Sequence, residues 1–196
     1  MRAVVVGMGV VLGLCAAGTG AEAFSASYDQ TVTQGGQVMN STVSMKDTMF
    51  RMESTVGGRA SVILHNDSGT YTYIPAEGIA MKVPAMNSFQ GPVEHAGSYM
   101  QYLNELKAER IGAAMIDGLP CEIYVFTEPA SQMLVTAWVW AAMQFPIRME
   151  YNGNKGKMLV EIHNLQLGNA IPDSAFQLPA GVQVMDTGGM IPIGQQ

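Results

Sequence analysis

Methionine thioethers and histidine imidazoles are the side chains in this sequence best suited to chemistry. The chain contains sixteen methionines and three histidines. Met45, Met49 and Met52 lie close together, as do Met81 and Met86. Thioether sulfur is a ligand for Cu(I), so methionine with histidine could form a copper site. The same methionines could instead line an adaptable apolar pocket or fill a plain core. All three interpretations remain open.

Motifs for catalysis are missing from the sequence. It has no Gly-x-Ser-x-Gly, no phosphate-binding glycine loop and no His-Glu-x-x-His. His65, His95 and His163 are far apart, and solvated or hydrogen-bonded histidines are the default in that case. We therefore expect no enzyme, no cofactor and no metal ion, with Met/His copper binding as an alternative.

Composition and charge exclude several classes of protein. The net charge is −6 and only 13% of residues are charged, so a nucleic-acid partner is not expected. Hydrophobic residues make up 48% of the chain, which excludes a disordered protein. Of the two cysteines, Cys15 lies in the apolar leader. Cys121 lies at the start of a strand pattern, where we expect a buried, unreactive thiol.

The N-terminus has the layout of a secretory signal peptide. Met1-Arg2 gives a positive start, residues 3–17 are almost wholly apolar, and Ala21-Glu22-Ala23 is a cleavage site of small residues. We expect residues 1–23 to be removed on export, which places the mature protein in a bacterial periplasm. Residues 24–186 would form one domain, and residues 187–196 a flexible tail.

Alternation of apolar and polar residues predicts about eleven strands, and turn residues separate most of them. The predicted strands cover residues 24–33, 37–46, 48–56, 59–65, 70–74, 78–83, 111–116, 121–127, 132–140, 146–151 and 157–165. A helical turn at 172–176 and a short last strand at 180–185 follow.

One segment has helical periodicity. Between Glu94 and Glu109, apolar residues recur at the spacing of an amphipathic helix. One helix cannot cover both faces of a sheet this large, and long antiparallel sheets curl. The sequence therefore predicts a mostly β protein, an antiparallel half-open barrel wrapped around one central amphipathic helix. Such a shape has an apolar interior with a mouth.

Three stretches carry a resemblance to a known family. They are Met49-Phe50-Arg51-Met52-Glu53, the run Trp138-Val139-Trp140 followed by residues 145–151, and the C-terminal Pro-x-x-x-Phe-x-x-Pro-x-Gly pattern of residues 172–181. In this order they resemble the periplasmic lipoprotein-carrier superfamily, the LolA/LolB-like proteins. Within it, the chain is most similar to an uncharacterised branch of outer-membrane lipoprotein-sorting-like domains. The resemblance spans residues 24–186.

The resemblance implies an eleven-stranded half-barrel with helical lid elements over an apolar cavity, and lipid binding rather than catalysis. The sequence departs from the family pattern in two places. Lys46-Asp47-Thr48 stands where the family has a proline, and residues 24–33 read as a strand where carriers have a helix.

We therefore predict a non-enzymatic binding protein that holds an acyl chain, a lipid or a lipoprotein and is itself a monomer. Each buried CH₂ contributes about 0.8 kcal/mol to such binding. An interaction or sensor module of the same fold is an alternative. The bulky apolar residues that we expect to line the cavity are Met52, Tyr73, Met81, Met100, Leu103, Trp138 and Trp140.

Two further features are candidates for contacts. The resemblance suggests that Arg51 helps to hold a lid shut, whereas alternation places it on the polar face as a solvated arginine. Residues 141–145 are almost wholly apolar where a polar turn is expected. Met143 and Phe145 therefore either pack against the barrel or make a transient contact with a membrane or partner.

Overall fold

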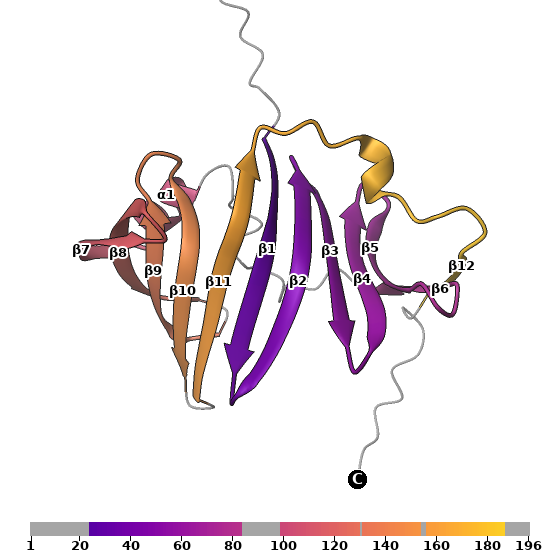
Figure 1. Ribbon diagram of the computed structural model, residues 1–196, viewed down its shortest axis with the longest axis horizontal. Helices are drawn as coiled ribbons and strands as arrows, with labels where there is room; N and C mark the ends of the chain where they lie inside the picture. Colours follow the sequence, from indigo (N-terminus) through magenta and orange to yellow (C-terminus); the bar gives the residue numbers. More distant parts are fainter. Residues whose placement is uncertain (1–23, 84–98, 130, 154–155, 187–196) are drawn as a thin grey trace, which may run out of the picture.

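The computed structural model describes residues 24–83, 99–129, 131–153 and 156–186 (Figure 1). These residues form a twelve-stranded open sheet and one short α-helix, α1 (Tyr99–Glu105). The strands are β1 (Ser25–Gln34), β2 (Gln37–Lys46), β3 (Met49–Val56), β4 (Arg59–Asn66), β5 (Gly69–Ile74), β6 (Ile79–Val83), β7 (Glu109–Ile116), β8 (Leu119–Thr127), β9 (Leu134–Trp140), β10 (Phe145–Gly153), β11 (Gly156–Leu167) and β12 (Gln183–Asp186). The predicted fold class, a mostly β half-open barrel with one helix, is confirmed.

The sheet joins two antiparallel meanders. Its order is β12-β6-β5-β4-β3-β2-β1-β11-β10-β9-β8-β7, so β1 and β11 pair at the centre although they lie at opposite ends of the sequence. Among the described strands, only β12 pairs in parallel, with β6. Gly35-Gly36 and Gly57-Gly58 form the β1–β2 and β3–β4 turns with φ between +58° and +79°. Such two-residue turns match the twist of antiparallel strands.

The two faces of the sheet differ in what covers them. We call the face that packs against α1 the inner face and the opposite one the outer face; in Figure 1, α1 lies behind the sheet. Tyr99 and Leu103 of α1 are buried in one apolar core together with Val135, Ala137 and Met149. This main core continues along the sheet through β11, β1 and β2 to β3.

The described helix is shorter than predicted at its C-terminal end. We expected it to reach Glu109, but it ends at Glu105 and β7 already begins at Glu109. Lys107 has φ +53°, and the Ala108 N–H donates to the Leu103 carbonyl at 2.9 Å. A left-handed residue of this kind closes a helix and turns the chain into the next element. The expected start of the helix, residues 94–98, lies outside the described residues.

A second apolar cluster lies on the outer face of β3–β5. The C-terminal strap, residues 168–186, crosses this face and includes the 3₁₀ turn η1 (Asp173–Phe176). Phe176 and Leu64 are both fully buried. The Arg51 Nη1 donates to the Ala175 carbonyl at 3.2 Å, and Asn66 Nδ2 donates to the Phe176 carbonyl at 2.8 Å. The predicted helical turn and the last short strand are therefore the elements that fix the strap.

Among the described residues, no helix has the length and apolar character needed to cross a membrane. The signal peptide and the tail that the sequence predicts lie outside the described residues. So do Met86, His95 and the tip of the β10–β11 hairpin.

Candidate ligand-binding face

The inner face carries a continuous row of cross-strand neighbours. Val43 of β2 lies opposite Met52 of β3, and Met52 lies opposite Ile63 of β4. The row continues through Thr72 of β5 to Met81 of β6. Directly opposed residues on paired strands have their side chains on one face. The register therefore assembles five side chains, four of them apolar, across five strands.

Burial decreases along this row. Val43 is fully buried and Met52 is 8% exposed, whereas Ile63 and Met81 are only half-buried. The neighbouring row ends in the same way, since buried Phe50 lies opposite half-buried His65, whose Nδ1 is 2.8 Å from Thr70 Oγ1. The β4–β6 end of the inner face thus keeps apolar side chains that the rest of the protein does not fully cover. This is the part of the inner-face row where apolar side chains remain partly exposed.

The α1 end of the inner face is built from tyrosines. The rings of Tyr99 and Tyr102 are 6.0 Å apart, and Tyr102 meets Phe126 of β8 edge-on at 6.0 Å. Burial raises the pKa of Tyr99 and Tyr151, and neighbouring tyrosines add to the effect. Burial likewise raises the pKa of Tyr28 on β1. These hydroxyl groups stay protonated through the physiological range.

Glu128 is a buried carboxylate next to these tyrosines. It is 7% exposed, and its Oε2 accepts a hydrogen bond from the Ser131 N–H at 2.6 Å. Its backbone N–H donates to the Met133 carbonyl, so it closes the β8–β9 turn. Its charge helps to raise the pKa of Tyr102 and Tyr151. No signal in the sequence marks Glu128 as buried, because a carboxylate in a loop is normally solvated.

The raised tyrosine pKa values predict a loss of stability at high pH. Tyr28, Tyr99 and Tyr151 bind their protons more tightly in the folded state than in the unfolded state, where the pKa is about 10. The stability that these protonated tyrosines give to the folded state is complete below about pH 10 and is lost as the pH rises further. Above about pH 10, each of these tyrosines should reduce the free energy of unfolding by up to about 1.4 kcal/mol for every further pH unit. Urea unfolding from neutral to alkaline pH measures this.

Tyr151→Phe is the matched variant for this measurement. It removes one of the three ionising groups, so its stability should fall less steeply above about pH 10 than that of the unchanged protein. An unchanged slope would show that Tyr151 ionises as freely in the folded chain as in the unfolded one.

The structure places four of the seven predicted lining residues on the inner face or on the helix that packs against it. Met52 and Met81 share the inner-face row described above. Leu103 is 1% exposed and belongs to the main core, and Met100 on the same helix packs against that core. These four residues surround the inner face at its two ends.

The other three predicted lining residues are placed differently. Tyr73 lies opposite Val62 and Ala80, on the face of β5 that does not carry Thr72. Trp138 lies opposite Arg148, whose guanidinium is 5.1 Å from the indole centre on the outer face. Trp140 ends β9 and is half-buried against the core. Tyr73 and Trp138 therefore do not line the inner face.

Arg51 and the β9–β10 tip are also resolved. Arg51 lies on the outer face, where its Nε donates to Glu53 Oε1 at 2.7 Å and its Nη1 contacts the strap, so it is remote from α1. Phe145 is 1% exposed, and its ring meets Tyr28 edge-on at 5.9 Å. Met143 is 52% exposed. Of the two residues at the tip that were candidates for a contact, Phe145 is buried and Met143 faces water.

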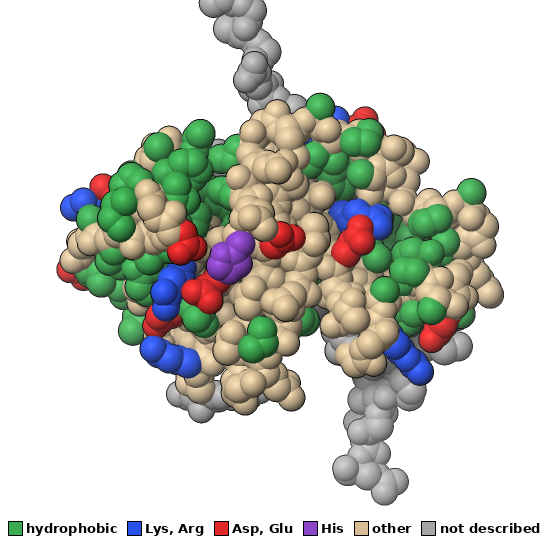
Figure 2. Space-filling model, viewed as in Figure 1, with side chains coloured by type: hydrophobic (Ala, Val, Ile, Leu, Met, Phe, Trp, Pro, Cys, Tyr) green, Lys and Arg blue, Asp and Glu red, His purple; other side chains and the backbone are tan. Residues whose placement is uncertain are grey.

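The outer face is polar at its centre. Charged and histidine side chains gather over β10, β11 and β1, with apolar patches to either side (Figure 2). Arg148 pairs with Glu150 at 3.3 Å, and Lys157 pairs with Glu150 at 3.0 Å. Hydrogen bonds from Asn164 and Thr42 lower the pKa of Asp29. These charges are paired with one another, which is typical of a solvated surface.

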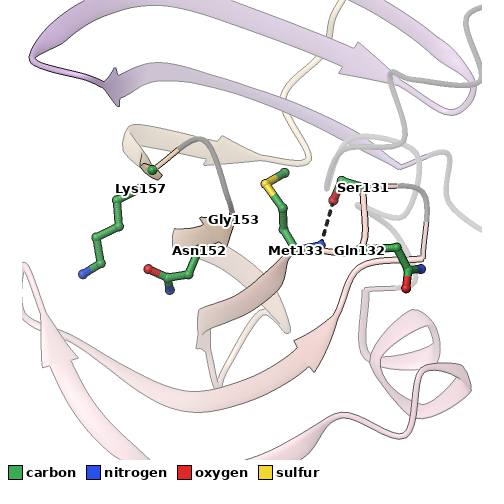
Figure 3. A pocket seen from close by; sticks show the side chains of 7 residues that line it. Ser131, Gln132, Met133, Asn152, Gly153 and Lys157 are labelled. Atoms are coloured by element: carbon green, nitrogen blue, oxygen red, sulfur yellow. Dashed lines mark hydrogen bonds between the residues drawn. The ribbon is translucent and has the colours of Figure 1, made fainter.

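Two open hollows lie away from the inner-face row. One, of about 550 Å³, lies between the β8–β9 turn and the β10–β11 hairpin (Figure 3). Its lining residues are Ser131, Gln132, Met133, Asn152, Gly153, Gly156 and Lys157. The other, of about 680 Å³, lies along β1–β4 and includes Asp29, Thr42, Arg51 and Glu53. Their charged groups already pair within the protein, so neither hollow presents a concentrated charge or a nucleophile.

The metal and thiol interpretations depend on a few residues. Among the described residues, no group of three or more His, Cys, Asp and Glu side chains could hold a metal ion. Met45 and Met52 lie on the inner face, whereas Met49 lies opposite Lys46 on the outer face.

Cys121 is buried, and burial raises the pKa of its thiol. A protonated, buried thiol is a poor nucleophile.

Comparison with known proteins identifies the fold. No protein-family model matches the chain, and no curated protein matches it. An uncharacterised conserved protein from Thermus thermophilus superposes with a TM-score of 0.58 at 13% identity, covering 85% of this chain and 91% of its own. MucB, solved in complex with the periplasmic part of MucA, superposes with a TM-score of 0.52 at 13% identity.

The MucB match covers 83% of this chain but only 57% of MucB, so the chain spans little more than half of that protein. A LolA superfamily protein from Nitrosomonas europaea also matches, with a TM-score of 0.39 at 12% identity over 80% of this chain and 90% of its own. At these identities the likeness concerns the fold. The predicted architecture, a large open and mostly antiparallel sheet with one helix, is the observed one.

Proposed function

We propose that this protein is a periplasmic, non-enzymatic binding protein that holds an acyl chain, free or as part of a lipid or lipoprotein, on the inner face of its sheet. The observation that carries the proposal is the decrease in burial from Val43 and Met52 to Ile63 and Met81 along one apolar row. A binding face of this kind needs apolar side chains that the empty protein leaves partly uncovered. The methionines in the row add a flexible, polarisable surface that adapts to different chains.

The energetics of acyl binding favour this site. Each CH₂ group removed from water contributes about 0.8 kcal/mol, so a chain of about 16 carbons contributes on the order of 10 kcal/mol before ordering costs. Half-buried Ile63 and Met81 would lose their remaining contact with water at the same time. The secretory layout of residues 1–23 supports the periplasmic assignment.

A pair of variants tests which face binds. Met81 and Tyr73 are both half-buried and lie on neighbouring strands, but Met81 is on the inner face and Tyr73 is not. A fluorescent apolar dye such as ANS should bind the folded protein and be displaced by fatty acids or lysolipids. Met81→Asp should weaken dye and fatty-acid binding at least tenfold, because an unpaired carboxylate would face the ligand's hydrocarbon. Fluorescence titration measures both affinities.

Tyr73→Asp is the control for this experiment, and its affinity should stay within about twofold of the unchanged protein. Circular dichroism shows whether each variant remains folded. A folded protein that binds neither dye nor fatty acid would contradict the proposal. If both variants lost affinity equally, the inner face would not be the binding surface.

Native mass spectrometry of the protein purified from its own periplasm identifies what it carries. A bound lipid is the expected result. Bound copper would favour the Met/His interpretation, and an empty protein in complex with another protein would favour an interaction or sensor module.

A further inference from the structure

We propose that β7 is a pairing edge through which two copies of this chain join into one continuous antiparallel sheet. β7 is the terminal strand of the sheet, and β8 is its only hydrogen-bonded neighbour among the described strands. In a strand, the N–H and C=O groups of alternate residues point to opposite sides, so half of the groups of β7 point away from β8. No described residue outside β8 makes a backbone hydrogen bond with them.

The side chains of β7 leave this edge unprotected. Solvent-exposed edges are normally blunted by lysine, proline, a β-bulge or a covering segment, and of these β7 has only a register shift between Arg110 and Gly112, near its start. β7 carries no lysine or proline, and its centre consists of the small residues Gly112, Ala113 and Ala114. Ile111 and Met115 flank this centre and are 56% and 64% exposed, which is high for apolar residues. An unpaired backbone edge and exposed apolar side chains thus coincide on one strand.

The charges of β7 lie at one end. Glu109 and Arg110 precede the apolar segment, and Arg110 Nε already pairs with Glu122 Oε1 on β8 at 3.0 Å. The remaining six residues are uncharged. A partner strand therefore meets neither repulsion nor a charge that must be desolvated over most of the edge.

The pattern of β7 is self-complementary, which identifies a second copy as the occupant. In an antiparallel pair with Ala113 opposite Ala113 of the partner subunit, Ile111 lies opposite Met115 of the partner subunit, and the reverse holds by symmetry. Four exposed apolar side chains are then covered in two cross-strand pairs. Arg110 lies opposite an uncharged residue, and Glu109 falls outside the paired segment.

The opposite edge of the sheet is the weaker candidate. β12 has four residues, half as many as β7. Pairing of β7 with β12 of another copy would be head-to-tail and would repeat without closure, whereas β7 with β7 closes as a two-fold dimer. The two-fold axis would be perpendicular to the sheet, so the inner faces of both copies would lie on the same side. This dimer revises the monomer that the sequence suggested, and it does not depend on the proposed ligand.

The mass of the protein in solution tests the dimer. Sedimentation of the mature chain over a wide range of concentration should show a mass that rises to twice that of one chain. Met115→Lys places a charge on the edge and should shift the midpoint of this transition at least tenfold towards higher concentration. Val38→Lys is the matched control, since Val38 is 61% exposed on β2, away from β7, and it should dimerise as the unchanged protein does.

A cysteine at Ala113 tests the register directly. Ala113→Cys should form an intermolecular disulfide under mild oxidation, because the two copies of this position face each other at the two-fold axis. The unchanged protein gives the background level of cross-linking, because its native Cys121 is buried. A protein that stays monomeric at every concentration overturns the proposal. A dimer that persists in Met115→Lys and does not cross-link in the Ala113→Cys variant overturns it as well, because its interface would lie elsewhere.

Discussion

Phe145→Asp is expected to destabilise the protein by more than the roughly 3–5 kcal/mol typical of truncating a buried phenylalanine. Phe145 is 1% exposed and packs edge-on against Tyr28, two strands away across the centre of the sheet. Aspartate would leave a cavity and place a carboxylate without a partner in an apolar site. A native protein has only about 5–15 kcal/mol to lose. Urea unfolding followed by circular dichroism should show a large fall in the midpoint or no folded protein.

Met143→Asp is the matched control at the same tip. Met143 is 52% exposed, and a surface substitution of this kind should change the free energy of unfolding by less than about 0.5 kcal/mol. If Phe145→Asp were as stable as Met143→Asp, the packing of the tip against Tyr28 would be wrong. Met143→Asp also tests membrane contact, which remains a prediction. Reduced co-sedimentation with liposomes at unchanged stability would support it.

Phe176→Ala is expected to cost about 3–5 kcal/mol and to loosen the C-terminal strap. Phe176 is fully buried on the outer face, where it covers the apolar side of β3–β5 that includes Leu64. Its loss leaves a cavity beneath a segment that is otherwise held by polar contacts, among them the 2.6 Å Lys46–Asp173 ion pair, and by the pairing of β12 with β6. Urea unfolding gives the stability, and limited proteolysis should show faster cleavage within residues 168–186.

Val184→Ala is the control on the same strap. Val184 is 50% exposed, so its truncation should change neither stability nor cleavage appreciably. Equal effects of the two substitutions would show that the strap is not anchored through Phe176.

Arg51→Ala separates a role of Arg51 in holding the strap from a role in closing a lid. It should speed strap cleavage while leaving the rate of fatty-acid release unchanged, because Arg51 contacts Ala175 and Glu53 rather than α1.

Local sequence patterns determined most of the secondary structure. Glycine pairs such as Gly35-Gly36 and Gly57-Gly58 marked turns that require positive φ, and strict alternation marked the strands between them. Both signals depend only on neighbouring residues, so they can be read without knowing the fold. The end of the helix was wrong by four residues, because Leu106 keeps the apolar spacing after Glu105, whereas the chain leaves the helix there and turns at the left-handed Lys107.

Alternation shows which residues share a face but not which face is inner. In β4, Ile63 points to one side and Val62 and Leu64 to the other, and all three are apolar. The structure places Ile63 on the inner-face row, whereas Leu64 is buried on the outer face, where η1 of the distant C-terminal strap contacts β4. Tyr73 and Trp138 were assigned to the inner face for the same reason, because an apolar side chain can satisfy either side of a doubly covered strand.

The sequence by itself determined a mostly β half-open barrel with one helix, an apolar interior and a set of bulky candidates to line it. The tertiary structure decided which candidates face one another. Met52 and Met81 share one face through the register of the strand pairs from β3 to β6. Tyr151 raises the pKa of Tyr99 on α1, and Glu128 raises that of Tyr151, although no local pattern connects the three residues. Propensity and alternation act over a few residues. The inner-face row and the exposed β7 edge arise from pairings between distant strands, whose order the local signals do not specify.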